Sequence, residues 1–201
     1  MTHPSPSTTP RAGRGEVRRR RILEAAVRVV GTGGLGAMTH RAVADEAGVP
    51  LGSTTYYFRD RDDLLRQTMQ HAIEVEAGRM AAIVDRAPQT PSVDGSVALL
   101  TEIFLDKSVA DPLYDLALFE LFLEATRNPV AREQTQRWTT LIAGIVDRVL
   151  PATTPQVPRS TVVQVVAALI DGLMLEAASN RELTLPELSE HLRVTISRFV
   201  I

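Results

Sequence analysis

Three features of the amino-acid sequence predict an all-α protein of about nine helices. Apolar residues recur at intervals of three and four along most of the 201 residues, the spacing of one face of a helix. The strict alternation of apolar and polar residues that marks a half-buried strand does not occur in the sequence. Prolines stand where one helical pattern stops and the next begins, as at Asp111-Pro112 and Asn128-Pro129. A chain of this length can bury a core of its own.

The residue types argue against several classes of function. Hydrophobic residues make up 44% and charged residues 23%, so the chain is not expected to be disordered as a whole. Without cysteine, neither a disulfide framework nor a thiolate zinc site is possible. The sequence has no G-x-S-x-G nucleophile motif, and its four histidines lack partners at metal-ligand spacing. We therefore expect no metal, no cofactor and no enzymatic activity.

Charge is distributed unevenly along the chain. The formal net charge is −2, but residues 1–66 hold 11 arginines against 7 acidic residues, while the remainder holds 11 basic against 17 acidic residues. A net charge of +4 beside one of −6 predicts a local site for a polyanion on the first third. We find no apolar run of the roughly 18 residues of a membrane helix and no signal peptide. We expect a cytoplasmic protein that does not enter a membrane.

The chain opens with a segment rich in Pro, Ser, Thr and Arg. Its composition predicts a disordered basic arm over residues 1–15. A first helix is predicted from Glu16 to about Val30, where glycines at 31, 33, 34 and 36 break the pattern. A phosphate-binding loop is not expected there, because these glycines lack a preceding strand and a following Lys-Ser/Thr pair.

The stretch from Thr39 to Phe58 predicts two short helices joined by a tight turn. Thr39 is a good N-cap for the first helix, and Gly48 suits the left-handed conformation that often ends one. Pro50 fits the first turn of the second helix. That helix begins with small polar residues and ends in aromatic ones. Since a helix-turn-helix must present the start of its second helix to a major groove, this layout predicts DNA binding.

The same stretch, extended from Gly36 to Leu64 (GAMTHRAVADEAGVPLGSTTYYFRDRDDL), resembles the N-terminal domain of the tetracycline-repressor (TetR) family of bacterial regulators. Ten positions match the family pattern in unbroken spacing: Thr39, Val43, Ala44, Ala47, Gly48, Val49, Gly52, Tyr56, Phe58 and Leu64. Thr55 stands where the family usually has a tyrosine, Tyr57 where it often has histidine, and Arg61 where it has lysine. The motif covers about a quarter of the chain; the rest resembles the family in length and helical pattern.

The resemblance implies a homodimer that binds a palindromic operator in double-stranded DNA and is released by a small-molecule effector. Thr39 and Tyr56 would then contact phosphates, and Arg61 would anchor the next helix to the DNA backbone. The predicted DNA-contacting residues are Thr39, His40, Leu51, Gly52, Ser53, Thr55, Tyr56, Tyr57 and Arg61. The arginines at 11, 14 and 18–21 are either a solvated tail or a second contact with phosphates or the minor groove.

The predicted domains are a DNA-binding domain over residues 16–60 and an effector-binding and dimerisation domain over 61–201. A long helix capped by Asp60 is predicted to reach about Arg86. Further helices are predicted at about 92–107, 112–127, 129–150, 159–179 and 184–200, separated by proline-containing breaks.

Residues 162–175 are apolar on nearly all sides, with Gln164 and Asp171 as the exceptions. A helix of this kind is buried, either in the core of one chain or against a second copy together with the last helix. For the second alternative, the predicted interface residues are Val163, Ala167, Ile170, Gly172, Leu192 and Ile196.

Aromatic and large apolar residues of the body are candidates for lining an effector pocket, although such residues at helical spacing also form ordinary core. The predicted lining is Phe104, Phe119, Phe122, Leu123, Trp138, Leu141 and Met174. Glu120 and Glu124 lie one turn apart, either solvated or facing the cavity, and the latter would favour a cation. The sequence thus predicts a ligand-responsive regulator, most simply a repressor; the alternative is a helical dimeric adaptor with little affinity for DNA.

Overall fold

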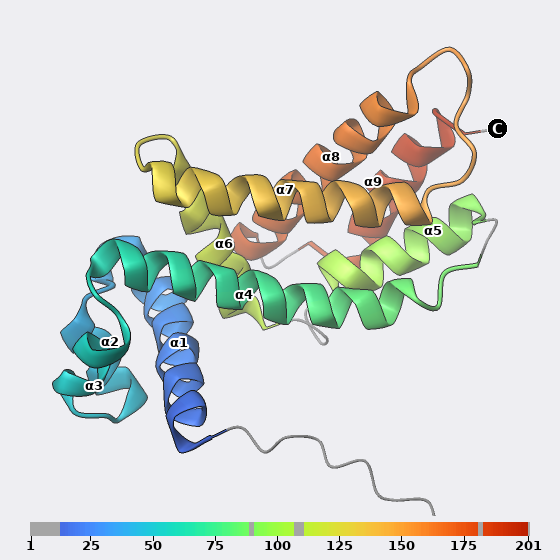
Figure 1. Cartoon of the computed structure of the whole chain (residues 1–201). Coiled ribbons are helices and arrows are strands. Elements are labelled where there is room, and N and C mark those ends of the chain that lie inside the picture. Colours follow the sequence, from blue (N-terminus) through green and yellow to red (C-terminus); the bar gives the residue numbers. More distant parts are fainter. Residues whose placement is uncertain (1–12, 89–90, 107–110, 181–182, 201) are drawn as a thin grey trace, which may run out of the picture.

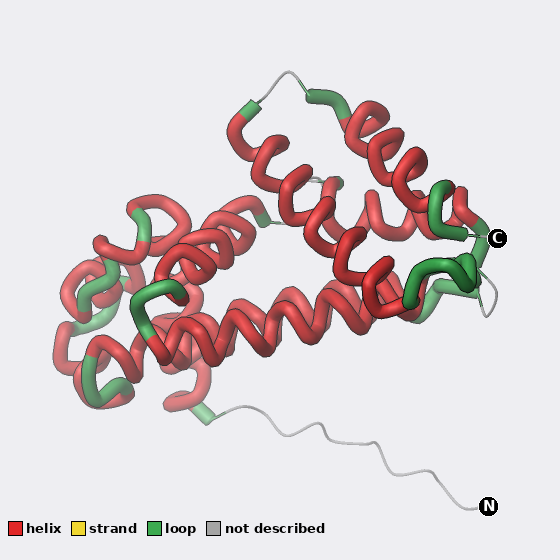
Figure 2. The backbone as a smooth tube through the Cα atoms, turned by 90° about the horizontal axis from the view of Figure 1, so that it is seen from above, coloured by secondary structure: helices red, strands yellow, loops and turns green. Residues whose placement is uncertain are grey.

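The computed structural model describes residues 13–88, 91–106, 111–180 and 183–200. Within these ranges the chain forms nine α-helices and no strand, apart from one isolated bridge between Thr153 and Val200 (Figure 2). The all-α prediction is confirmed. The elements in order are α1 (Arg14–Gly33), the 3-10 turn η1 (Leu35–Ala37), α2 (His40–Ala47), α3 (Leu51–Tyr57), α4 (Arg61–Val84), α5 (Val93–Leu100), the π-helical turn η2 (Thr101–Leu105), α6 (Pro112–Ala125), α7 (Pro129–Val149), α8 (Arg159–Ser179) and α9 (Leu185–Ser197).

The first three helices form a small unit at one end of the molecule. α2 and α3 lie beside α1, and α4 runs from this unit along the body formed by α5 to α9 (Figure 1). α1 also packs along α6, so the body contacts the N-terminal unit directly as well as through α4.

Side-chain caps begin the body helices at the predicted breaks. The carboxylate of Asp111 accepts a hydrogen bond from the amide of Leu113, and the Asn128 side chain accepts one from Val130, both at 2.9 Å. Each cap precedes a proline at the first helical position, where no amide donor is lost. The expected start-and-stop signals therefore set the real boundaries of α6 and α7.

The first helix is longer than predicted at both ends. Arg14 and Gly15, assigned to a disordered arm, belong to α1; the rest of that arm, with Arg11, lies outside the described residues. The expected break at Gly31 is wrong as well, because α1 continues to Gly33 and ends where Gly34 takes a positive φ of 73°. A Cβ on Gly31 would lie 2.5 Å from the carbonyl oxygen of Leu113. The glycine therefore allows α6 to approach α1 closely.

The helix predicted over residues 92–107 is interrupted. α5 ends at Leu100 and the π-helical turn η2 follows. The guanidinium of Arg79 on α4 donates to the carbonyl of Ile103 in this turn, at 2.8 Å, and is paired at 2.7 Å with the buried carboxylate of Glu76. A charged group of α4 thus holds η2 in the core.

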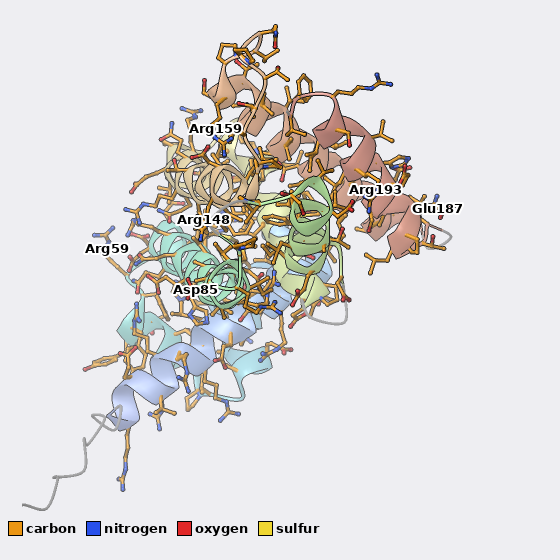
Figure 3. All side chains as sticks on the ribbon, turned by 90° about the vertical axis from the view of Figure 1, so that its right-hand side faces the viewer. Arg59, Asp85, Arg148, Arg159, Glu187 and Arg193 are labelled. Atoms are coloured by element: carbon orange, nitrogen blue, oxygen red, sulfur yellow. The ribbon has the colours of Figure 1, made fainter. Side chains whose placement is uncertain are left out.

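Arginines tie the far end of the body together, where Figure 3 labels Arg148, Arg159 and Arg193. Arg148 donates to the carbonyls of Ala87 and Pro88 after α4, and Arg193 pairs with Asp94 on α5. Arg159 donates to three carbonyls at the end of α7, those of Asp147, Leu150 and Pro151. Arg148 and Arg159 thus bind carbonyls at or just after the C-terminal ends of α4 and α7, and Arg193 joins α9 to the first turn of α5.

The helix α8 corrects the expectation that no run is apolar and long enough for a membrane helix. Among the described helices it alone meets that test by length and composition. It packs against α7, α9 and η2, and Val162, Val166 and Ile170 on its inner face are buried. In this fold it serves as a core helix.

Candidate functional site

The predicted helix-turn-helix is present, with its caps in place. The Thr39 hydroxyl accepts a hydrogen bond from the amide of Ala42 at 3.1 Å and so begins α2. Gly48 ends α2 in the left-handed conformation, with φ 62° and ψ 42°. Pro50 is the N-cap residue of α3, one position before the first turn in which it was expected. These local signals place α3 beside α2.

The helix α3 has one buried face and one exposed face. Thr54 is fully buried, and its hydroxyl donates to the carbonyls of Leu51 at 2.8 Å and His40 at 3.3 Å, which joins α3 to α2. The exposed face consists of Leu51, Gly52, Thr55 and Tyr56, and the Tyr56 side chain is 81% exposed. Ser53, predicted to read a base, lies half-buried between the two faces.

Tyr57 is turned toward α1. Its ring packs edge-to-face on Tyr56 with 5.0 Å between centroids, and it is half-buried. Its hydroxyl lies 3.5 Å from the position that a Cβ on Gly15 would take. Tyr57 therefore links α3 to the start of α1, a structural role that the sequence did not predict.

Arginines without an acidic partner among the described residues gather next to this exposed face. Arg14, Arg18 and Arg21 lie on one side of α1 and, with Gly48, Val49 and Pro50, line a cavity of about 420 Å³ beside the α2–α3 turn. Arg41 on α2 is also exposed and unpaired. The prediction omitted Arg41, although its place in the first turn of α2 was visible in the sequence.

Neighbouring arginines are engaged within the protein. Arg20 pairs with Glu24, Arg28 with Glu46 at 2.7 Å, and Arg66 with Asp63 at 2.9 Å. Arg59, labelled in Figure 3, pairs with Asp60. Among the described residues of α1, three of the guanidinium groups without an acidic partner, those of Arg14, Arg18 and Arg21, lie beside the α2–α3 turn.

Arg61 contacts the protein itself. Its guanidinium donates to the carbonyl of Leu35 at 3.0 Å and more weakly to that of Met38 at 3.4 Å. From the other side, the amide of Leu35 donates to the Glu120 carboxylate of α6 at 3.1 Å. We call this arrangement the Leu35 clamp. It holds the segment between α1 and α2 from both α4 and α6, so Glu120 is not a solvated residue.

A cavity of about 320 Å³ opens between α6 and α8. Its lining consists of Phe119, Phe122, Leu123, Asp171, Gly172 and Leu175. Leu123 and Leu175 are 62% and 55% exposed, so an apolar groove reaches the surface. We call it the α6–α8 groove. Three predicted lining residues meet here, and no group of three or more His, Cys, Asp or Glu in the described chain is arranged for a metal.

The other four residues of the predicted effector lining do not line the α6–α8 groove. Phe104, Trp138 and Met174 are 2%, 4% and 5% exposed and belong to the core, where aromatics at helical spacing often lie. Leu141 lines a different cavity, between α4 and α7. Periodicity identified these residues as inward-facing but could not distinguish core from cavity wall.

Most residues of the predicted dimer interface are buried within the single chain. Val163, Ile170, Leu192 and Ile196 are at most 6% exposed in the single chain, since they form the contact between α8 and its own neighbours. Ala167 is half-buried, and Gly172 lines the α6–α8 groove. The outward side of these two helices instead carries Val165, Ala168 and Val194, of which the two valines are 41% and 52% exposed.

Comparison with known proteins matches both the N-terminal unit and the helical body to models of one protein family. The profile "Tetracyclin repressor-like, C-terminal domain" matches residues 91–200, and "Bacterial regulatory proteins, tetR family" matches residues 22–68. The chain belongs to the tetR family. As a member, it is a transcriptional regulator with a DNA-binding helix-turn-helix domain. The family consists of regulators, not enzymes, and the adaptor alternative is set aside.

Relatives of this TetR-family chain cover nearly its full length. The transcriptional regulator BetI of Burkholderia mallei is 29% identical over 175 residues, which is 84% of this chain and 86% of BetI. The solved structure of the multidrug binding protein EbrR complexed with ethidium is 30% identical, with a TM-score of 0.66, over 89% of this chain and 98% of EbrR. A TetR-family member from Streptomyces coelicolor, SCO1917, is 29% identical with a TM-score of 0.70, over 92% of this chain and 98% of that one.

Proposed function

We propose that this TetR-family regulator binds a palindromic operator as a homodimer and leaves it when a small, mainly apolar molecule enters the α6–α8 groove. The single observation that carries the proposal is the Leu35 clamp. Through Glu120 it joins the helix that lines the groove to the segment from which α2 begins. A cytoplasmic location follows from this function.

The exposed face of α3 would enter the major groove. Leu51, Gly52 and Thr55 would approach base edges there, as small side chains at the start of a recognition helix do. Ser53 and Tyr57, being half-buried, would contribute at the margin of the contact. Thr39, His40 and Tyr56 would approach the flanking backbone.

The unpaired guanidinium groups of Arg14, Arg18, Arg21 and Arg41 would neutralise phosphates on either side of α3. Such contacts supply most of the affinity and all of its dependence on salt. Arg61 would act differently from the original expectation. Because its guanidinium donates to Leu35 and Met38, we propose that it supports the Leu35 clamp first and contacts a phosphate only with its remaining donors.

A second copy would cover the outward side of α8 and α9. Val165 and Ala168 of α8 and Val194 of α9 are exposed apolar residues, and covering apolar surface of this kind favours association. Two recognition helices must then span half-sites about 34–36 Å apart. A small change in the tilt of the N-terminal units would alter that spacing.

Release by a ligand requires a difference in affinity between the two states. Phe119 and Phe122 line the groove, and the carboxylate of Glu120, which lies between them in the sequence, accepts the hydrogen bond from the Leu35 amide. A molecule wedged between α6 and α8 would shift α6, strain or break this hydrogen bond and turn the N-terminal unit away from the operator spacing.

Glu120 and its neighbour Glu124 provide a matched test. Genomic fragments retained by the protein in a gel shift identify an operator, and ligands that release it are found by titration. Glu120→Met, which has no oxygen to accept the Leu35 amide, should still bind operator and ligand but lose most of the coupling between them. Glu124→Met removes a carboxylate of the same helix that pairs at 2.7 Å with Arg127, beyond the end of α6, and that has no contact with Leu35; its coupling should stay as in the wild type. Equal coupling in both variants would overturn the proposed route, and failure to retain any fragment would overturn the operator proposal.

A further inference from the structure

The α6–α8 groove has a single charged group in its lining. Five of its six lining residues are phenylalanine, leucine or glycine, and the sixth is Asp171 on α8. α7 packs against both α6 and α8 and lies across them in Figure 1, so the two helices that frame the groove share one support. A ligand in this groove would meet two aromatic rings, two leucines and one carboxylate.

Asp171 has no hydrogen-bond donor and no cation as a partner among the described residues. The two other candidate carboxylates nearby on α6 are already in use: Glu120 accepts from the amide of Leu35, and Glu124 pairs with Arg127. Of the two alternatives for Glu120 and Glu124, solvated or facing the cavity, the structure favours neither: both carboxylates have partners in the protein, and neither lines the groove. Burial raises the pKa of Asp171 to about 6, and no neighbouring charge opposes that rise. An ionised carboxylate held this way favours a cationic partner.

We propose that the α6–α8 groove is a binding site for organic cations, with the positive group against the Asp171 carboxylate and the apolar part against Phe119 and Phe122. Phenylalanine faces attract a desolvated cation in addition to the carboxylate. The proposal rests on the groove being the effector site, and it names the chemical class that the site selects. Neutral molecules of the same shape fit the walls but leave the carboxylate unpaired.

Gly172 keeps the groove open. A Cβ built at this position meets no atom within 4 Å, so a larger side chain would project into free space without displacing its surroundings. Gly78 on α4 also has no atom within 4 Å of such a Cβ, but Gly78 does not line the α6–α8 groove. A large side chain at Gly172 would therefore fill the groove, and the same side chain at Gly78 serves as the matched control.

The direct test compares 10-methylacridinium with acridine, which have nearly the same shape and differ in charge at pH 8. Binding of each to the full-length protein is measured by calorimetry. The wild type should bind the cation about 10- to 100-fold more tightly than the neutral compound. Asp171→Asn should remove this preference, and Gly172→Leu should weaken both compounds. Gly78→Leu should change neither, which separates filling of the groove from a general effect of replacing a helical glycine.

Misfolding is excluded by the denaturation midpoint of Asp171→Asn at pH 8, which should rise because an unpaired buried charge has been removed. Equal binding of both compounds by the wild type, or an unchanged preference in Asp171→Asn, overturns the cation site. A third outcome also overturns it: the wild type binds both compounds only weakly, and Leu175→Glu sediments as a monomer. The groove would then be an interface between two copies of the chain. If the cation binds through Asp171 but leaves the operator bound, the cation site stands and its proposed effector role fails.

Discussion

The DNA-binding surface and the α6–α8 groove differ in the sign of the charge that each leaves unpaired. Beside α3, Arg14, Arg18 and Arg21 have no acidic partner among the described residues, whereas Arg20, Arg28 and Arg66 close by are paired. In the groove the unpaired group is an acid, Asp171, while Glu124 on the facing helix is paired.

The same comparison distinguishes how each charge is held. The arginines are exposed, where an unpaired ion costs little because water solvates it. Asp171 is mostly buried, so its ionised form carries a desolvation cost that no partner offsets. The exposed arginines can therefore remain unpaired in the absence of DNA at little cost to stability. The unpaired Asp171 lowers the stability of the ligand-free protein, so it is the stronger indication of a binding site.

The largest expected effect concerns the arginines of α1. Replacing Arg14, Arg18 and Arg21 together by alanine should weaken operator binding by about 100-fold or more at moderate salt and lower the salt slope by roughly two to three. Fluorescence anisotropy over a range of salt concentrations measures both. Arg20→Ala, which removes an exposed arginine that is paired with Glu24, is the control. If Arg20→Ala weakens operator binding as much as the loss of one of the three unpaired arginines, pairing with an acidic residue does not decide which arginines contact DNA.

The next effect concerns stability and pH at Asp171. Its pKa is raised from 3.8 to about 6 in the folded protein, so the folded state binds the proton more tightly than the unfolded state does. The free energy of unfolding therefore falls as pH rises between these values, and Asp171→Asn should gain about 1–3 kcal/mol at pH 8. The gain should shrink toward zero as pH falls to about 4, as urea unfolding would measure.

The control for this effect is Glu176→Gln, an exposed acid on the same helix, which should stay within about 0.5 kcal/mol of wild type at both pH values. A loss of stability in Asp171→Asn at pH 8 would mean that the carboxylate has a partner in solution.

A smaller effect separates the two tyrosines of α3. Tyr56 is 81% exposed, so Tyr56→Ala should leave the unfolding midpoint unchanged while weakening operator binding by about 1–2 kcal/mol, as for one lost phosphate contact. Tyr57→Ala should instead lower the midpoint, because the ring packs between α3 and α1. Reversed outcomes would mean that α3 presents its other side to DNA.

The smallest effect is expected for the only tryptophan. Trp138 is 4% exposed and lies outside the groove lining, so a bound ligand should leave the position of its emission maximum unchanged. A clear shift on titration with 10-methylacridinium would show that the ligand reaches the core behind α7, and the groove would no longer be the sole effector site.

The two surfaces were not equally predictable from sequence. The motif of the DNA-binding surface is contiguous, and Thr39, Gly48 and Pro50 act through local backbone geometry that each residue type dictates. The groove combines α6 with α8, which are far apart in the chain. Periodicity selected Phe119 and Phe122, which line the groove, together with Phe104 and Trp138, which are buried in the core, because it indicates that a side chain faces inward and not what it contacts there.

The roles of Gly31 and Asp171 depend on residues far away in the chain, although each residue stands out in the sequence. Gly31 was taken as a helix break, yet a glycine is equally needed where another backbone passes, here that of Leu113. Asp171 is the only acidic residue in the apolar stretch 162–175, and the sequence alone assigns it no role. A carboxylate that interrupts such a helix indicates either a partner or a ligand, and the fold was needed to decide between them.

The Leu35 clamp has a consequence that can be followed on a single atom. The Leu35 amide is bonded to the Glu120 carboxylate, and its own carbonyl is held by Arg61. This proton can exchange with solvent deuterium only when α6 and the start of the DNA-binding unit separate. Its protection factor, measured on the protein without DNA or ligand, therefore gives the free energy needed to separate α6 from the DNA-binding unit.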